Sequence, residues 1–413
     1  KHYKDVNRDL YAVFIKRMNS INAYGGYCGL LSPDTYAVLS VYSNLRKWLL
    51  INRDIISYLQ LGKKIFQTVN VSVGISLFQN MLLERDLSYY EGDFDNGMLI
   101  IKNRKTIKKR YILSIKNQPF LFSESGIEEH LKEGKTIEPD FGEVRTGIQT
   151  GDNYRRVMMR WEVPLNLRGT RWVYYAKGGG FNKYIGRADF VLDWSKEAQE
   201  YYSNSRNARI RDKKYHFRYG ITYSDITSNN QFSARILPKT WLFDVKGSAI
   251  FTHNIKIKTL LGILNTKIAN YILSMLNPTV SFQPGDLKRF PIPEKIQLKE
   301  NGIENIVSLI VKLKKELFSF DPLSEFYNPH KYNTQVSNFK ENIYRNYFYI
   351  IMVNELQYFL DNIALERYGM YDDLDDVIDK FGESVIKYPL IQGLKLLKKP
   401  LELEFDDSDK DIL

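Results

Sequence analysis

The sequence predicts a mixed fold in three regions: an α/β region over residues 1–115, a β-rich region over 116–295 and a helical region over 296–413. Three observations lead to this prediction. Helix and strand patterns alternate through the first region, short strands separated by Gly, Asn and Asp turns fill the second, and apolar residues recur at helical spacing in the third. A chain of 413 residues has room for two or three domains with ample core.

The elements of the first region follow from local periodicity and from the turn residues between the periodic segments. We predict helices over residues 9–18, 38–50 and 124–133, and strands over 27–31, 55–61, 71–78 and 111–115. A basic run surrounds the start of the last of these strands; its members are Lys102, Arg104, Lys105, Lys108, Lys109 and Arg110. Either these side chains form a solvated strand edge that resists aggregation, or they contact phosphates.

A glycine-rich stretch over residues 145–186 dominates the second region. Glycines let backbone amides approach a partner closely, and interleaved Arg, Lys, Tyr and Trp side chains suit contact with both phosphates and bases. Hairpin turns would also account for the glycines. A nucleotide-binding loop is disfavoured because the run from Lys177 to Gly180 lacks P-loop spacing, and no Gly-x-Gly-x-x-Gly occurs in the sequence.

A second basic run follows a predicted helix over residues 197–203. It contains Arg206, Arg209, Arg211, Lys213, Lys214, His216 and Arg218, with Tyr215 and Phe217 among them. This composition fits a clamp on a nucleic-acid backbone beside aromatic contacts. Further along, we predict a core helix over 260–276 and a helix with one apolar stripe over 303–317. Residues 338–368 form either one long helix or two helices.

Composition limits the classes of function. The formal charge of +11 and the pI near 9.2 favour a polyanionic partner. Cys28 is the only cysteine and the five histidines are far apart, so we expect no disulfide and no metal site. We find no run long enough to span a membrane and no signal peptide, and expect a cytoplasmic protein. The Glu138-Pro139-Asp140 string with Glu143 is only a weak match to a nuclease motif.

Several short blocks occur in an order that resembles one protein family. They include Gly147-Ile148-Gln149-Thr150-Gly151-Asp152-Asn153, Lys177-Gly178-Gly179 and Lys183-Tyr184-Ile185-Gly186, preceded by Leu10-Tyr11, Gly25-Gly26, Leu31-Ser32-Pro33, Leu45-Arg46 and Leu61-Gly62. This order is similar to that of the PglX adenine-specific DNA methyltransferases of BREX phage-defence systems, and in part to type IIG and type ISP restriction-modification enzymes. The likeness thins after about residue 300.

The resemblance implies that three parts of the chain have different functions. Residues 1–115 correspond to the second half of a Rossmann-like class I methyltransferase sheet, 116–295 to a β-rich target-recognition domain, and 296–413 to a helical C-terminal region. It also implies that Phe66 stacks on an adenine flipped out of the duplex. The Gly-rich cofactor loop and the Asn-Pro-Pro-Tyr/Phe loop of the family are absent from the sequence. We therefore expect no catalytic residue and no methyl transfer by this chain alone.

The implied partners are double-stranded DNA, S-adenosyl-L-methionine bound mainly by the absent N-terminal half, and that half itself, supplied in cis or in trans; other defence-system proteins are further candidates. Sequence reading would come from loop side chains. The candidate DNA-binding residues are Gln149, Thr150, Asn153, Arg155, Arg156, Lys177, Gly178, Gly179, Lys183, Arg187, Arg206, Arg209, Arg211, Lys213 and Lys214. Two alternatives stay open: a stand-alone DNA-binding specificity subunit, and the C-terminal part of a type IIG restriction enzyme.

Overall fold

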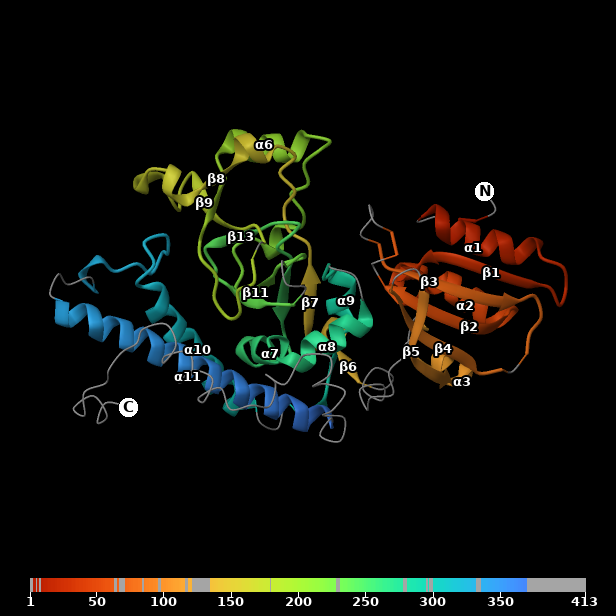
Figure 1. Ribbon diagram of the computed structural model, residues 1–413. Helices are drawn as coiled ribbons and strands as arrows, with labels where there is room; N and C mark the ends of the chain where they lie inside the picture. Colours follow the sequence, from red (N-terminus) through yellow and green to blue (C-terminus); the bar gives the residue numbers. More distant parts are fainter. Residues whose placement is uncertain are drawn as a thin grey trace, which may run out of the picture. The chain divides into compact units, whose positions relative to one another are not determined.

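The computed structural model divides the chain into two compact units, labelled by element in Figure 1. The first contains residues 1–136 and 272–292, and the second contains 137–271 and 293–413. The described residues are 3–4, 6, 9–62, 65–66, 71–83, 85–95, 98–115, 118–120, 134–178, 180–227, 231–277, 281–294, 296, 300–331 and 336–369. The helix expected over 124–133 and the chain beyond 369 lie outside them. The three functional regions expected from the sequence stay predictions.

The first unit is built on a five-stranded sheet with the order β1-β3-β2-β4-β5. Its strands are β1 (Tyr27–Pro33), β2 (Asp54–Gly62), β3 (Val73–Gln79), β4 (Leu87–Asp95) and β5 (Met98–Ile107). Both β1 and β2 run antiparallel to β3, so they point the same way, and β4 is parallel to β2. The predicted strands over 27–31, 55–61 and 71–78 are thereby confirmed.

Three helices complete the first unit: α1 (Leu10–Ile21), α2 (Ser43–Asn52) and α3 (Lys109–Ser114). Their apolar side chains share one core with the sheet, to which α1 contributes Ile15 and α2 contributes Leu45 and Leu49. The unit also includes α9 (Pro284–Lys288) and the short pair β6 (Lys135–Thr136) and β15 (Pro291–Ile292). The helix expected over 38–50 begins later, at Ser43, because the 3-10 turn Ser40–Tyr42 takes the place of its first residues; another 3-10 turn, Asp34–Ala37, precedes it.

The strand expected over residues 111–115 is wrong, because this segment forms α3. Ile112 and Ile115 are buried, while Leu113 and Ser114 between them are exposed, a spacing that a helical turn satisfies as well as a strand would. Lys102, Arg104 and Lys105 of the basic run lie instead on β5, an edge strand of the sheet with mostly exposed side chains. This position agrees with the solvated-edge interpretation of the basic run.

The second unit contains two four-stranded sheets. One has the order β12-β11-β14-β7, from β7 (Gly142–Arg145), β11 (Gly220–Tyr223), β12 (Ala234–Leu237) and β14 (Ala249–Thr252). The other has the order β13-β9-β10-β8, from β8 (Val157–Met159), β9 (Trp172–Ala176), β10 (Phe190–Asp193) and β13 (Trp241–Phe243). Short strands and polar turns thus make this unit β-rich, while residues 272–292 of the expected β-rich region belong to the first unit.

Helices surround these sheets (Figure 1). They are α5 (Asn153–Arg156), α6 (Lys196–Asn204), α7 (Ile257–Leu264), α10 (Glu300–Phe318) and α11 (Val336–Tyr368), and α8 (Lys267–Leu276) leads from the second unit into residues of the first. The single helix expected over 260–276 is wrong, since Asn265 and Thr266 separate α7 from α8. The Asn265 side chain accepts a hydrogen bond from Ala234 N and donates one to Ala234 O, both 2.9 Å long, so it bonds to β12 at the break.

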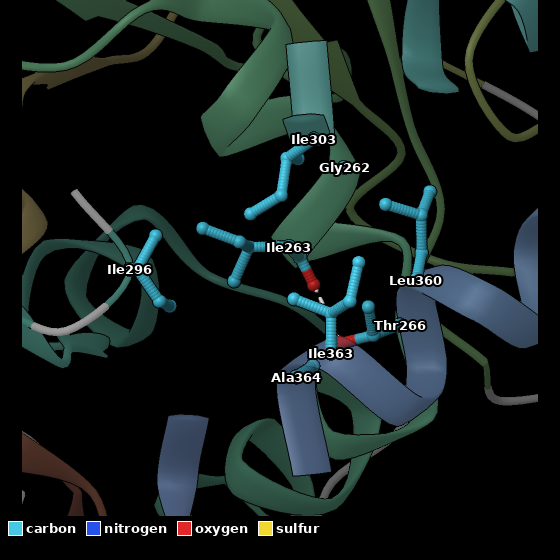
Figure 2. A pocket seen from close by; sticks show the side chains of 8 residues that line it. All are labelled: Gly262, Ile263, Thr266, Ile296, Ile303, Leu360, Ile363 and Ala364. Atoms are coloured by element: carbon cyan, nitrogen blue, oxygen red, sulfur yellow. Dashed lines mark hydrogen bonds between the residues drawn. The ribbon is translucent and has the colours of Figure 1, made fainter. Parts of the chain in front are cut away.

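The helices α7, α10 and α11 pack together around a small apolar cavity (Figure 2). Gly262 and Ile263 of α7 face Ile303 of α10 and Leu360 of α11 there. The buried side of α10 contains Ile303, Val307 and Ile310, while Leu309 is 38% exposed. The helical region therefore packs on the β-rich region as part of one unit. Within the described residues, no helix combines the length and apolar character that a bilayer crossing requires.

Candidate nucleic-acid interface

Two loops of the second unit are joined by their backbones. Gln149 N donates a hydrogen bond of 3.0 Å to Arg209 O, and Arg209 N donates one of 2.8 Å to Gln149 O. The first loop, residues 147–156, contains the block from Gly147 to Asn153, which belongs to the glycine-rich stretch. The second loop, residues 204–214, contains most of the second basic run. We call these two segments together the loop pair. Tertiary structure therefore brings together two of the motifs that the sequence analysis singled out separately.

Gly151 makes the loop pair possible. Its φ of 73° lies in the left-handed region, and a Cβ added there would be 2.9 Å from the Asn207 carbonyl carbon. The turn then enters α5, where the Asp152 carboxylate accepts a hydrogen bond of 3.1 Å from Arg155 N. The buried Thr150 donates a hydrogen bond of 2.7 Å to the Asn153 side-chain oxygen. These contacts hold the loop rigidly and leave Gln149 and Asn153 exposed.

The loop pair carries cations that protein carboxylates do not neutralise. Arg206, Arg209, Arg211 and Lys213 are exposed, and none forms an ion pair with another residue of the described part of the chain. Arg155 and Lys214 have only loose pairs, at 3.8 Å to Asp152 and 3.7 Å to Asp212. Exposed ion pairs of this kind contribute little to stability, so both side chains stay available to an external anion.

Arg156 differs from its neighbours because it is held inside the unit. One of its guanidinium nitrogens lies 3.6 Å from the buried Asp193 carboxylate, and the group covers the ring of Tyr201 at 4.8 Å. Arg171 also pairs with Asp193, at 3.2 Å. Burial alone would raise the pKa of Asp193, but hydrogen bonds from Arg171 and Ser195 hold it below its usual value. Arg156 therefore anchors the loop to β10.

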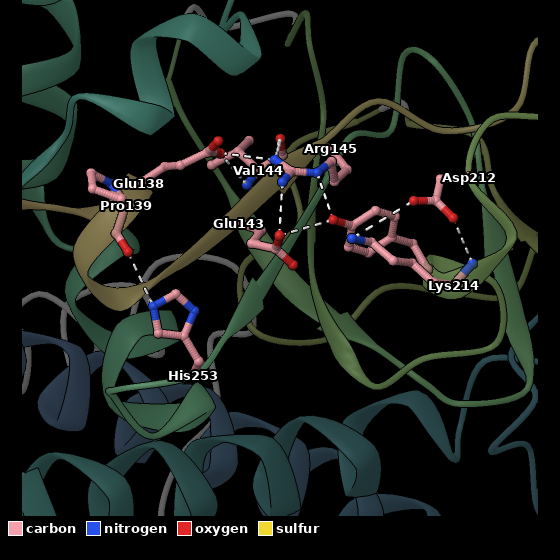
Figure 3. Close-up of polar contacts among 9 residues, drawn as sticks. Glu138, Pro139, Glu143, Val144, Arg145, Asp212, Lys214 and His253 are labelled. Atoms are coloured by element: carbon pink, nitrogen blue, oxygen red, sulfur yellow. Dashed lines mark hydrogen bonds and ion pairs between the residues drawn. The ribbon is translucent and has the colours of Figure 1, made fainter.

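A polar cluster anchors the second loop (Figure 3). Arg145 on β7 pairs with Glu138 and Glu143, both at 2.9 Å, and its Nε donates a hydrogen bond of 2.9 Å to the Tyr215 hydroxyl oxygen. The same hydroxyl donates to Glu143 at 3.0 Å. The two glutamates of the weak nuclease motif are thus committed to an arginine. No group of three or more potential metal ligands occurs in the part of the chain that the structure describes.

The Lys177-Gly178 segment lies at the end of β9. The Lys177 ammonium covers the ring of Phe190 at 5.5 Å. Gly178 has a φ of 76°, and its backbone passes close to the Lys246 carbonyl, which leaves no room for a side chain. This glycine is therefore required by local packing. Gly179 lies outside the described residues.

Lys183 and Arg187 make their polar contacts away from the loop pair. Lys183 Nζ donates a hydrogen bond of 2.7 Å to Asn265 O, and Lys314 of α10 donates one of 2.9 Å to Lys183 O. Burial lowers the pKa of Lys183. Arg187 pairs with Asp321 at 3.1 Å. The structure thus joins these two candidates to the helical region.

Three exposed aromatic side chains lie among the arginines and were absent from the candidate set. Tyr154, on α5 between Asn153 and Arg155, is 94% exposed, and Trp161 and Phe217 are partly exposed. Exposed aromatic rings beside cations are suited to stacking on nucleic-acid bases. Aromatic residues directly beside arginines were the sequence signal that could have identified them.

Phe66 belongs to the first unit. It follows β2, whose last residue is Gly62, and its side chain is 46% exposed. It lies beyond the carboxyl end of that strand, where open α/β sheets bind their ligands. The exposure shows that Phe66 is not a core residue.

Comparisons with known proteins give two relatives by sequence, although no family model matches the chain. The chain is 26% identical over 343 residues to the adenine-specific methyltransferase BrxX of Escherichia coli O9:H4 (strain HS), which covers 76% of this chain and 27% of that protein. It is 25% identical over 447 residues to the adenine-specific methyltransferase PglX of Lacticaseibacillus casei (strain Zhang), which covers 96% of this chain and 36% of that protein. The chain spans about a third of the length of these relatives.

Among solved structures, a restriction-modification enzyme is similar in fold over most of the chain. It is the type IIL restriction-modification enzyme MmeI in complex with DNA, with a TM-score of 0.50 and 13% identity. The match covers 92% of this chain and 51% of that one.

Proposed function

Because this chain is a distant homologue of the adenine-specific methyltransferases BrxX and PglX, we propose that it is the DNA-recognition portion of an S-adenosylmethionine-dependent N6-adenine DNA methyltransferase. Such an enzyme would act in a phage-defence system of the BREX or restriction-modification type. The proposed substrate is double-stranded DNA. In this proposal the second unit holds the duplex and the first unit forms part of the catalytic sheet.

The observation that carries the proposal is the loop pair. It places Arg206, Arg209, Arg211 and Lys213 beside the Gln149–Asn153 turn, without a carboxylate partner for any of the four cations in the described residues. Unpaired cations on a rigid support attract the phosphate backbone, since binding releases condensed counterions from the DNA. The exposed amides of Gln149 and Asn153 are able to bond adenine edges in the major groove. The cations would thus contact the phosphates, and the two amides the bases, on one surface of the unit.

We propose different roles for the remaining candidates. Arg156 and Gly178 support the loops from within, since each is committed to a contact inside the unit. Thr150 orients Asn153. Lys183 and Arg187 hold the helical region against the β-rich region through Lys314 and Asp321. Substitution of Lys183 or Arg187 should lower the stability of the protein and should not change the preferred DNA sequence.

The first unit offers a surface for the rest of a methyltransferase sheet. Among the described strands β1 pairs only with β3, so its outer edge is open. The helix α1 exposes a continuous apolar stripe of Leu10, Phe14, Met18 and Ile21. Open edges and apolar helix faces are normally covered. We propose that the N-terminal methyltransferase half, in cis or in trans, covers both features.

The described residues of this chain do not provide a complete S-adenosylmethionine site. The Gly25-Gly26 turn precedes β1, whereas cofactors of open α/β sheets bind beyond the carboxyl ends of strands. Its backbone is also engaged, because Gly25 N donates to Asn80 O and Asn80 N donates to Gly26 O. We therefore assign no cofactor contact to this chain, and propose that the N-terminal half supplies that site. The role of Phe66 is then to stack on the flipped adenine, beyond the end of β2.

Salt-dependent binding tests the proposal on the full chain. A fluorescently labelled duplex of mixed sequence is titrated by anisotropy at several salt concentrations, with wild type and with the Arg206→Gln/Arg209→Gln double variant. We expect the double variant to bind more weakly and to flatten the slope of log Kd against log salt by about 2. The Lys47→Gln/Lys312→Gln double variant is the control, since it removes the same charge from exposed helical positions outside the loop pair.

Two outcomes of this titration would contradict the proposal. A wild-type chain that does not bind duplex DNA in low salt contradicts the proposal. So does a control variant that weakens binding as much as the arginine variant, because binding would then follow net charge and not the loop pair.

A further inference from the structure

Phe217 combines three features that rarely occur together. It is a bulky residue with a φ of 53°, in the left-handed region that such residues seldom adopt. Its side chain is 37% exposed. It also lies in the basic segment 206–218, whose Arg211 has a φ of 62° as well. Strained backbone of this kind persists only where the surrounding structure imposes it, and it concentrates at functional sites.

The structure imposes the strain through the two preceding residues. Tyr215 stacks on Phe251 at 5.2 Å, and its hydroxyl is held by Arg145 and Glu143 (Figure 3 shows these two). His216 donates a hydrogen bond of 3.0 Å from Nε2 to Ile210 O. Both side chains are directed into the unit. The chain must then turn sharply, and the turn directs Phe217 outward.

The Phe217 ring packs against another aromatic ring of the same unit. Trp194 contacts it edge to face at 6.0 Å, and contacts His216 in the same way at 5.5 Å. Trp194 in turn stacks on the buried Tyr202 at 6.2 Å. A row of rings therefore leads from the core to the surface. Phe217 is the exposed end of this row, which resists lateral displacement of the ring.

Cations flank the ring along the chain. Arg211, Lys213, Lys214 and Arg218 are all exposed. Arg218 also covers the ring of Phe251 at 5.1 Å, which keeps its guanidinium close to this surface. An apolar ring between cations matches a duplex, in which charged phosphates flank stacked bases. An acidic protein surface would satisfy the cations but offers no flat apolar partner for the ring.

We propose that Phe217 is a wedge that inserts its ring at a base step of duplex DNA while the neighbouring cations hold the phosphates. This inference rests on the proposed DNA-binding function and adds a residue to it. Because the ring is held in place before binding, little side-chain freedom is lost on insertion. Wedges of this kind unstack a step, so they favour duplexes that already contain a weak step.

The test compares two labelled duplexes with the full chain: one perfectly paired, and one identical except for a central mismatch. Anisotropy gives Kd for wild type and for Phe217→Ala, Phe217→Trp and Phe359→Ala. Phe359 is the matched control, because it is also an exposed phenylalanine of the second unit, 55% exposed on the regular helix α11. We expect wild type to prefer the mismatched duplex, and Phe217→Ala to lose about tenfold in affinity together with that preference.

Three results would overturn the inference or its premise. If wild type and Phe217→Ala bind both duplexes equally well, the wedge is wrong and the proposed DNA binding stands. If Phe217→Ala weakens both duplexes equally and its thermal unfolding midpoint drops, Phe217 has only a structural role. If wild type binds an acidic protein but neither duplex, the proposed function fails as well. Retention of the preference by Phe217→Trp and Phe359→Ala would support the wedge.

Discussion

Gln149 and Arg209 exchange two main-chain hydrogen bonds, of 3.0 and 2.8 Å, across two loops that are distant in the sequence. This pairing fixes where the glycine-rich block and the basic run meet. The side chains of both residues are exposed, so the contact uses only backbone atoms and leaves an amide and a guanidinium available on one surface.

Gly151→Ala should separate the two loops. The alanine would need a φ of 73° and would place its Cβ 2.9 Å from Asn207 C, so we expect a loss of about 2–3 kcal/mol in the free energy of unfolding. Urea denaturation measures the free energy of unfolding, and duplex binding shows whether separation of the two loops weakens the affinity for DNA. Gly169→Ala is the control, since Gly169 has a φ of 78° but no atom within 4 Å of the added Cβ, and it should cost only about 1 kcal/mol. Equal losses for the two variants would exclude a role for the close approach.

Two helix glycines should respond with opposite signs. A Cβ on Gly262 of α7 would be 2.9 Å from methyl groups of Ile303 and Val307, so Gly262→Ala should destabilise the helical packing by about 1–3 kcal/mol. Gly302 of α10 has open space around it, and Gly302→Ala should stabilise by about 0.5–1 kcal/mol through helix propensity. Chemical denaturation of both variants shows whether each substitution raises or lowers the free energy of unfolding. Stabilisation by Gly262→Ala would show that α7 and α10 are not packed as described.

Three half-buried lysines, Lys183, Lys267 and Lys314, predict a rise in stability with pH. Burial, together with the neighbouring Lys183, lowers the pKa of Lys314 to about 8. The unfolded value is about 10.4, so between pH 8 and 10 the unfolded state binds more protons and the free energy of unfolding increases with pH, by on the order of 2 kcal/mol. Burial also lowers the pKa of Lys183 and Lys267, which act in the same direction.

Lys314→Met should reduce this dependence, because the methionine does not titrate. Denaturation at pH 7, 8, 9 and 9.5 measures the slope; higher pH is avoided, since buried tyrosines such as Tyr184 have a raised pKa and act in the opposite direction there. Lys312→Met, at an exposed position two residues away on α10, should leave the slope unchanged. A slope that is the same in Lys314→Met as in wild type would contradict the assignment.

Phe66→Ala should impair catalysis more than DNA binding, once the N-terminal methyltransferase half is supplied. Loss of base stacking is worth about 1–3 kcal/mol, so single-turnover methylation of a duplex should slow by roughly tenfold or more. Phe66→Tyr keeps the ring and should retain most of the rate. Full methylation activity in Phe66→Ala would refute the stacking role and leave the binding role of the second unit intact.

The sequence alone determined the elements whose pattern is local. The strands β1, β2 and β3, the helix α6 and the helical character of α11 follow from residue patterns within each segment. The resemblance to adenine-specific methyltransferases was also readable, because it lies in the order of short blocks. Both kinds of information are carried by neighbouring residues.

Only the tertiary structure decided which cations are free and where helices break. Lys183, Arg187 and Arg156 look like Arg209 and Arg211 in the sequence, yet the first three are held by Asn265, Asp321 and Asp193. Asn265 ends α7 because its side chain bonds to β12, a contact that no local pattern contains. The availability of a charge and the end of a helix depend here on partners distant in the chain, and folding alone selects those partners.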